Sequence, residues 1–308
     1  MKEFIILILK GLGMGAANVI PGVSGGTIAL ITGIFERLID AIKSFNLKAA
    51  KLLFTFKLAA FSKHTDLKFL IAVFIGIAIS IKSLAHLFDY LFTNYPIYIW
   101  AYFFGLVLAS VYFVGKRITH WGISVAASFI IGTAIAVTIS VLNPATENQG
   151  FIYLIICGVA AICSMILPGL SGSFILFIMG NYKLVAIEAI NDMDFNILIP
   201  VIIGAIVGLL AFSHLLSWVF KKYRNQTISL LTGFILGSVS ILWPWQNKIY
   251  LLNDIGLKII KSGEPIVIKY ERYLPKNFDL AFFISIGLII FGVVSIWAIE
   301  LGAQKTKK

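Results

Sequence analysis

The sequence predicts an all-α polytopic membrane protein, built as an inverted-topology repeat with one re-entrant helical hairpin and three transmembrane helices in each half. Of the 308 residues, 59% are hydrophobic and 13% are charged, and the mean hydropathy is +0.97. Apolar stretches of about 20 residues recur along the chain, long enough to cross a membrane as helices. Two related motifs, NVIPGVSGGTIALITG (18–33) and MILPGLSGSFILFIMG (165–180), interrupt apolar segments in the two halves.

The first inverted repeat is expected over residues 1–150. It begins with the interrupted segment 4–42, whose arms are each short for a full crossing. A re-entrant hairpin fits best, because a break exposed to lipid would leave backbone groups unsatisfied. Residues 43–66 carry too many lysines to span, and we expect an amphipathic insert on the cytoplasmic leaflet, with a solvated loop as the alternative. Full spans are predicted near 67–92, 97–115 and 121–142.

The second inverted repeat is expected over residues 151–308. It begins with the second interrupted segment, 151–190, which we again interpret as a re-entrant hairpin. Full spans follow near 196–220, 227–245 and 279–302, and the spans of this repeat therefore lie within residues 196–302. Residues 246–278 are predicted to form an external loop between the last two spans.

The distribution of basic residues predicts that both termini are cytoplasmic. In that orientation the cytoplasmic side receives the basic loops, namely Lys43 to Lys68, Lys116 with Arg117, the stretch from Lys221 to Arg224, and the tail KTKK. The predicted external loop 246–278 disagrees, because it holds six basic and three acidic residues. The net charge of +11 is concentrated between apolar segments, which favours contact with membrane phospholipids over nucleic acid.

An internal duplication relates the two halves. The motifs align without a gap from Pro21/Pro168 to Gly33/Gly180, with seven identities in thirteen positions. Residues 74–114 also align with 202–242, with ten identities in forty-one positions. Because three spans are an odd number, the second half enters from the opposite side of the membrane. Inverted repeats of this kind place a substrate site near the midplane, where discontinuous helices meet.

The two breaks predict a site for an anion. A helix start exposes backbone N–H groups and carries a partial positive charge, glycine allows close approach, and a hydroxyl adds a donor. The candidate residues for binding a phosphate headgroup are Gly22, Ser24, Gly25, Gly26 and Thr27 in the first break, and Gly169, Ser171, Gly172 and Ser173 in the second. The alternative is that these small residues serve close helix packing.

The paired PGVSGGT…G and LPGLSGS…G motifs, with this length and spacing, resemble the bacterial and archaeal polyprenyl-phosphate transporter family, formerly a membrane domain of unknown function. The resemblance covers nearly the whole chain. It implies a flippase that moves undecaprenyl phosphate, or a related polyprenyl-phosphate lipid, across the cytoplasmic membrane of a prokaryote for recycling in cell-wall synthesis. The family often carries an acidic residue where Asn18 stands, so the resemblance supplies no titrating carboxylate at this position.

Further polar residues are candidates for accessory roles. Those near the hairpin ends could receive phosphate or serve as interfacial anchors, and the paired histidines could carry a coupling proton or make structural hydrogen bonds. With Asn18, the accessory set is Glu36, Arg37, Lys183, His86 and His214. A coupling cation and the oligomeric state stay open. We expect no cofactor, no metal and no catalytic residue.

Two other functions compete with transport of a lipid phosphate. Membrane undecaprenyl-pyrophosphate phosphatases use similar hairpins, but their motif continues with arginine where this chain has Gly25 and Gly172, and they carry paired glutamates that the first hairpin lacks. A small-anion channel or exchanger would also direct helix starts at an anion, and the sequence cannot separate a groove open to lipid from a closed pore.

Overall fold

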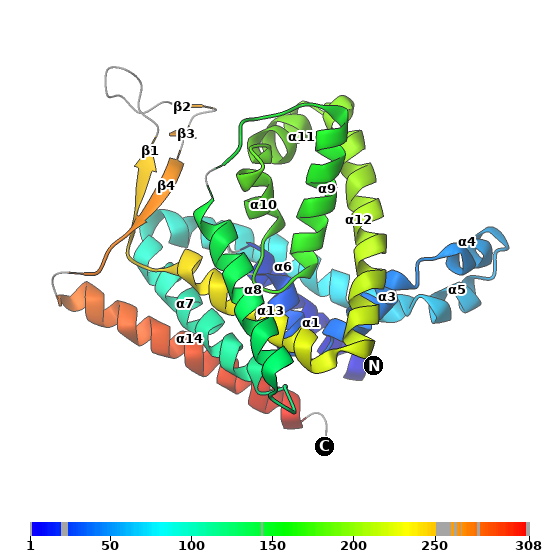
Figure 1. Cartoon of the computed structure of the whole chain (residues 1–308), viewed down its shortest axis with the longest axis horizontal. Coiled ribbons are helices and arrows are strands. Elements are labelled where there is room, and N and C mark those ends of the chain that lie inside the picture. Colours follow the sequence, from blue (N-terminus) through cyan, green and yellow to red (C-terminus); the bar gives the residue numbers. More distant parts are fainter. Residues whose placement is uncertain are drawn as a thin grey trace.

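The computed structural model describes residues 2–19, 24–142, 144–250, 260–261, 264–265, 267–275 and 278–305 (Figure 1). The chain is mostly helical. The first half contains α1 (Lys2–Val19), α2 (Gly25–Ile31), α3 (Phe35–Lys43), α4 (Leu47–Phe54), α5 (Leu58–His64), α6 (Leu67–Asn94), α7 (Pro96–Gly115) and α8 (Ile123–Val141). The second half contains α9 (Phe151–Ile166), α10 (Gly172–Ile178), a π-helical turn (Leu184–Glu188), α11 (Ala189–Asn191), α12 (Phe195–Lys222), α13 (Arg224–Ser238), a 3₁₀ turn (Val239–Leu242) and α14 (Leu280–Lys305).

Within the described residues, six helices are long and apolar enough to cross a membrane: α6, α7, α8, α12, α13 with its 3₁₀ turn, and α14. They correspond to the six predicted spans, and their ends differ from the predicted ends by a few residues. This result supports a multi-pass helical membrane protein. Figure 1 shows the start of α1 and the end of α14 towards the lower side of the view, and α11 and the strands towards the upper side.

Both interrupted segments form a helix, a break and a short second helix. In the first, α1 is followed by α2 and α3, and in the second, α9 is followed by α10 and α11. Each short helix ends at a glycine with a φ of +75°, Gly33 after α2 and Gly180 after α10. The next backbone N–H then reaches back into the helix, from Ile34 to Ala29 and from Asn181 to Leu176. Glycine is favoured at this left-handed position because it has no Cβ.

Four helix pairs carry most of the packing, and they make equivalent contacts in the two halves. Helix α1 lies along α6, and α9 lies along α12. At the first crossing, a Cβ on Gly76 would lie 2.2 Å from the carbonyl oxygen of Ile8. At the second, a Cβ on Gly204 would lie 2.0 Å from that of Ile155. Residues 8 and 155 are related by the same 147-residue offset as the two motifs. Only glycine allows backbones to approach this closely.

The last helix of each half packs against the other half. Helix α14 lies along α7, and α8 lies along α13. Gly105 approaches the carbonyl of Ile289 at the first crossing, and its repeat equivalent Gly233 approaches that of Phe129 at the second. The two halves therefore interlock through matched glycine contacts, and the main hydrophobic core contains residues from both.

Two segments lie outside the helical bundle, one helical (43–66) and one that contains β-strands (246–278). Residues 43–66 form the short helices α4 and α5, which project to one side of the bundle (Figure 1). The predicted loop 246–278 contains strands that the sequence analysis did not predict: β1 (Gln246–Tyr250) pairs antiparallel with β4 (Val267–Arg272), and β2 (Ile260–Lys261) pairs with β3 (Glu264–Pro265).

Candidate functional site

The first break ends in a helix start whose backbone donors are bonded within the protein. Ser24 is the N-cap of α2, and its hydroxyl oxygen accepts a hydrogen bond from the Gly26 N–H at 3.1 Å. The Gly25 N–H donates to Asn18 Oδ1 at 2.7 Å, and the Thr27 N–H donates to the Ser24 carbonyl at 2.9 Å. Ser24 and Thr27 are buried, whereas Asn18 is exposed. Gly22 lies outside the described residues.

The second break ends in a helix start that is less enclosed. Ser171 is the N-cap of α10, but its side chain accepts no capping hydrogen bond; the Ser171 and Ser173 hydroxyls are instead 2.7 Å apart. Ser171 is half-buried and Ser173 is exposed. Among the described residues, no protein group accepts a hydrogen bond from the backbone N–H of Gly172 or Ser173. These N–H groups therefore have no protein acceptor among the described residues, and of the two residues Ser173 is exposed whereas Gly172 is buried.

The two breaks lie in direct contact. The Ser24 hydroxyl donates to the carbonyl oxygen of Leu167 at 3.2 Å, and the Gly169 N–H donates to Thr27 Oγ1 at 3.2 Å. A Cβ on Gly26 would lie 2.6 Å from the carbonyl oxygen of Ile166. Gly169 has a φ of +84° and packs closely on the backbone of α13. The structure thus brings together the two motifs that the sequence analysis selected, although 142 residues separate Thr27 from Gly169.

The carboxyl ends of both short helices are bonded to polar side chains. Lys10 Nζ donates to the Thr32 carbonyl at 2.8 Å, and the Arg117 guanidinium donates to the Ile31 carbonyl. In the second half, the Tyr153 hydroxyl donates to the Met179 carbonyl at 2.8 Å. Cations at a helix C-terminus offset its partial negative charge. Burial lowers the pKa of Arg117, while the nearby carboxylate of Glu300 acts in the opposite direction.

The charged accessory residues near the hairpin ends form ion pairs. Glu36 pairs with Arg224 at 2.8 Å, and Lys183 pairs with Glu188 at 2.8 Å. Arg37 bonds to Asp66 at 2.6 Å and to Glu3 at 3.0 Å. The hydrogen bond to Asp66 raises the pKa of Arg37. These contacts give each residue a structural partner.

The two histidines are described to different extents. His214 is exposed, and its Nδ1 lies 2.7 Å from the Leu210 carbonyl of its own helix, α12. The side chain of His86 lies outside the described residues. A coupling role for either histidine therefore stays a prediction.

Comparisons with known proteins decide the family. The model of the family described as undecaprenyl phosphate translocase-like matches residues 14–258. The chain belongs to this family. A protein named polyprenyl-phosphate transporter from Vibrio cholerae serotype O1 is 37% identical over 309 residues, covering 98% of both chains. One of the same name from Staphylococcus aureus is 32% identical over 298 residues, covering 90% of this chain and all of that protein. No solved structure gives a significant match.

The family assignment confirms the resemblance that the paired motifs indicated. The match to the family model begins at residue 14 and continues through both breaks and five of the six candidate spans. Both relatives are bacterial, and together with the six apolar helices they indicate a multi-pass membrane protein of a prokaryote.

The sequence analysis missed a set of contacts between the two halves. The Ser217 hydroxyl donates to Asp40 Oδ1 at 2.7 Å, Lys221 pairs with Asp40 at 3.2 Å, and Lys43 donates to the Ser217 hydroxyl at 3.2 Å. A small cleft of about 20 Å³ lies beside them, lined by Glu36, Ile39, Asp40, Ser217, Phe220 and Lys221. The sequence shows basic residues in the last turn of α12, but it does not show that they pair with residues of α3, because this contact depends on the tertiary fold.

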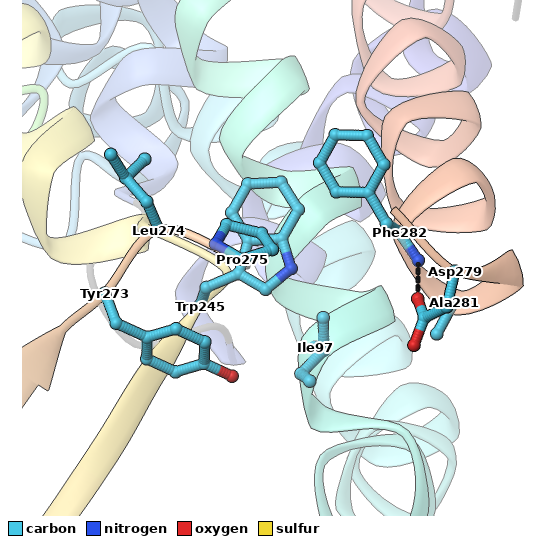
Figure 2. Close-up of a pocket in the computed structure, with 8 residues that line it drawn as sticks. All are labelled: Ile97, Trp245, Tyr273, Leu274, Pro275, Asp279, Ala281 and Phe282. Carbon is cyan, nitrogen blue, oxygen red and sulfur yellow. Dashed lines mark hydrogen bonds between the residues drawn. The ribbon is translucent and has the colours of Figure 1, made fainter. Parts of the chain in front are cut away.

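A larger pocket, of about 510 Å³, lies apart from the breaks, where α7 and α14 begin (Figure 2). It is lined by Ile97, Trp245, Tyr273, Leu274, Pro275, Asp279, Ala281 and Phe282. Its carboxylate, Asp279, accepts a hydrogen bond from the Phe282 N–H at 2.9 Å. The lining includes none of the predicted site residues, and a carboxylate disfavours phosphate. This pocket is therefore not the candidate headgroup site.

Proposed function

We propose that this chain is a transporter, not an enzyme, and that it moves undecaprenyl phosphate or a related polyprenyl phosphate across the cytoplasmic membrane. The names of two relatives that align with nearly the whole chain support the substrate class. The observation that carries the site is the direct contact between the two breaks, through Ser24 with Leu167 and Thr27 with Gly169.

We also propose that the two halves form an inverted-topology repeat with re-entrant hairpins. The equivalent crossings at Gly76 and Gly204, and at Gly105 and Gly233, support a common ancestry of the halves. Three spans in the first half would reverse the orientation of the second. In such folds, a substrate site near the midplane is exposed to each side in turn, as one repeat rocks against the other.

The headgroup of the substrate would bind at the open start of α10. A phosphate monoester carries about −1.5 to −2 charges near neutral pH and several acceptor oxygens. The Gly172 and Ser173 N–H groups have no acceptor among the described residues, and the exposed Ser173 hydroxyl is hydrogen-bonded only to the hydroxyl of Ser171, so these two hydroxyls could turn together towards a phosphate. The prenyl tail would stay in lipid, because only the charged headgroup needs to be shielded from hydrocarbon.

The start of α2 would join the site after a rearrangement. Its donors are bonded to Asn18 and Ser24 in this conformation, so a phosphate must displace these groups to reach them. Asn18 is exposed and can be displaced without opening the core. We infer that the described conformation is closed at the first break, and that the pairs Glu36–Arg224 and Asp40–Lys221 separate when this end of the interface opens.

A transport assay in proteoliposomes tests this function. The full chain is reconstituted with polyprenyl phosphate, and the lipid that appears in the opposite leaflet is measured over time. Ser24→Ala combined with Ser171→Ala should strongly reduce the rate, because it removes a hydroxyl from each break. Ser83→Ala is the matched control, since the exposed Ser83 bonds only to carbonyls of its own helix.

Full activity of the double variant would contradict the proposed headgroup site. Release of inorganic phosphate from polyprenyl pyrophosphate would indicate a phosphatase instead. Chloride flux without movement of polyprenyl phosphate would indicate a small-anion channel or exchanger.

A further inference from the structure

Helices α4 and α5 form an arm, residues 45–64, that projects from the side of the helical bundle (Figure 1). The arm has its own internal contacts. Phe45 packs edge-on against Phe61, with ring centroids 6.1 Å apart, and the Asn46 side chain caps α4 and contacts His64 at 3.3 Å. At its base, Asp66 is bonded to Arg37. These contacts hold the arm in a defined conformation.

The outer part of the arm exposes large apolar side chains. The exposed fraction is 90% for Leu47, 81% for Phe54, 87% for Phe56 and 61% for Leu58. The short helices of the arm are not among the candidate spans, so these side chains are not explained by a membrane crossing. Contiguous exposed apolar residues of this size mark a surface that binds a partner or a membrane.

The backbone at Phe56 supports a role for its side chain. Phe56 has a φ of +55°, a left-handed conformation that glycine adopts freely and a bulky residue adopts at a cost. Its N–H bonds to the Leu53 carbonyl, and that of Lys57 bonds to Leu52, so the turn closes the end of α4. A strained phenylalanine whose ring is almost fully exposed gains nothing from the protein core, which indicates an external contact.

The charge of the arm identifies the partner. The segment 41–65 contains five lysines and no acidic residue; the lysines are Lys43, Lys48, Lys51, Lys57 and Lys63. Lysines that flank exposed phenylalanine and leucine are typical of segments that lie in the headgroup region of an anionic leaflet. A second copy of the arm would be disfavoured as a partner, because it carries the same positive charge.

We propose that the arm is an interfacial anchor, which inserts Phe54, Phe56 and Leu58 into the leaflet at the α3–α6 end of the bundle and binds anionic phospholipids through its lysines. The proposal depends on the membrane location of the chain and does not depend on its transport function.

Site-specific labelling of the full chain in vesicles tests the anchor. A fluorescent label is attached at Phe56→Cys, in a Cys157→Ala, Cys163→Ala background, and the control label at His120→Cys, an exposed residue of the loop between α7 and α8. In phosphatidylcholine vesicles that contain phosphatidylglycerol, brominated acyl chains should quench the label at 56 severalfold more strongly than the label at 120. Iodide in the water should quench the two in the opposite order.

Two further variants separate insertion from folding. Phe56→Gly relieves the left-handed strain, so the fold is retained, but a label at Phe54→Cys should then be quenched less by brominated lipid. Lys48→Gln, Lys51→Gln, Lys57→Gln and Lys63→Gln together should remove the difference between anionic and purely zwitterionic vesicles. Equal quenching by iodide of the labels at 56 and 120 would overturn the proposal. Protection of the label at 56 from iodide only at high protein density would also overturn it, because that result indicates contact between copies of the protein.

Discussion

Asn18 shows how one side chain can set the state of the first break. Its Oδ1 accepts the hydrogen bond from the Gly25 N–H that an anion would otherwise receive. The equivalent position in the second half is Met165, which has no such acceptor, and the start of α10 has no side-chain cap. The sequence motifs are alike, but the residues seven positions before Gly25 and Gly172 make the two helix starts different.

Substitution of Asn18 should separate capping from binding. Asn18→Leu removes the acceptor and should destabilise the protein by about 1 kcal/mol, the usual cost of a lost helix cap. Asn18→Asp keeps the acceptor and adds a negative charge at a helix start, so stability should be retained. Where the new carboxyl is ionised, its charge should nevertheless slow transport by repelling the phosphate. Protonation of the carboxyl should remove this effect, which is compatible with the acidic residue that the family often carries at this position. Thermal unfolding and proteoliposome transport measure the two effects, and faster transport by Asn18→Asp would contradict the placement of phosphate here.

Gly26 is the residue through which the two breaks approach most closely. Gly26→Ala would place a Cβ 2.6 Å from the Ile166 carbonyl oxygen and should destabilise the protein by about 1–3 kcal/mol. Gly287→Ala on α14 is the matched control, because no atom lies within 4 Å of its Cβ and alanine favours a helix. Equal thermal stability of the two variants would show that the breaks do not pack as described.

At the scale of elements, hydropathy predicted the spans well because length and apolar content alone define them. The pairing of β1 with β4 was not predicted, since the segment 246–278 was assigned by its polarity and its position between spans. The π-helical turn at Leu184–Glu188 has no signal in the sequence pattern. The sequence analysis expected the two helix starts to meet, but the direct hydrogen bonds between the breaks and the closure of the first break by Asn18 depend on tertiary packing that neither motif encodes alone.

Breaking the ion pair between Glu36 on α3 and Arg224 at the start of α13 should change the transport rate more than the stability of the protein. Glu36→Arg or Arg224→Glu alone places like charges together, and exposed pairs of this kind contribute about 0–1 kcal/mol, so the melting temperature should change little. Transport should nonetheless change, because the closed end of the interface is weakened. The double variant restores the pair in reverse and should recover the wild-type rate. If both single variants change the transport rate and the double variant does not restore it, transport does not depend on direct pairing of Glu36 with Arg224.

At the scale of the whole molecule, two halves interlock so that each supplies one helix start to a shared centre. Helices α7 and α14, and α8 and α13, cross between the halves at matched glycines, so the two halves are packed tightly against each other at two equivalent crossings. The two helix starts differ, because Asn18 bonds to the start of α2 and no side chain caps the start of α10. Under the proposed function, the phosphate would therefore bind at the start of α10 first and then displace Asn18 from the start of α2.

The most direct test of the central claim is an experimental structure of the full chain with polyprenyl phosphate bound. The account predicts that the phosphorus atom lies beside the start of α10, with phosphate oxygens within hydrogen-bond distance of Ser173 and the Gly172 N–H, and that Asn18 has turned away from Gly25. A phosphate held instead in the aromatic pocket at Trp245 and Phe282, with both breaks packed together as they are now, would contradict it.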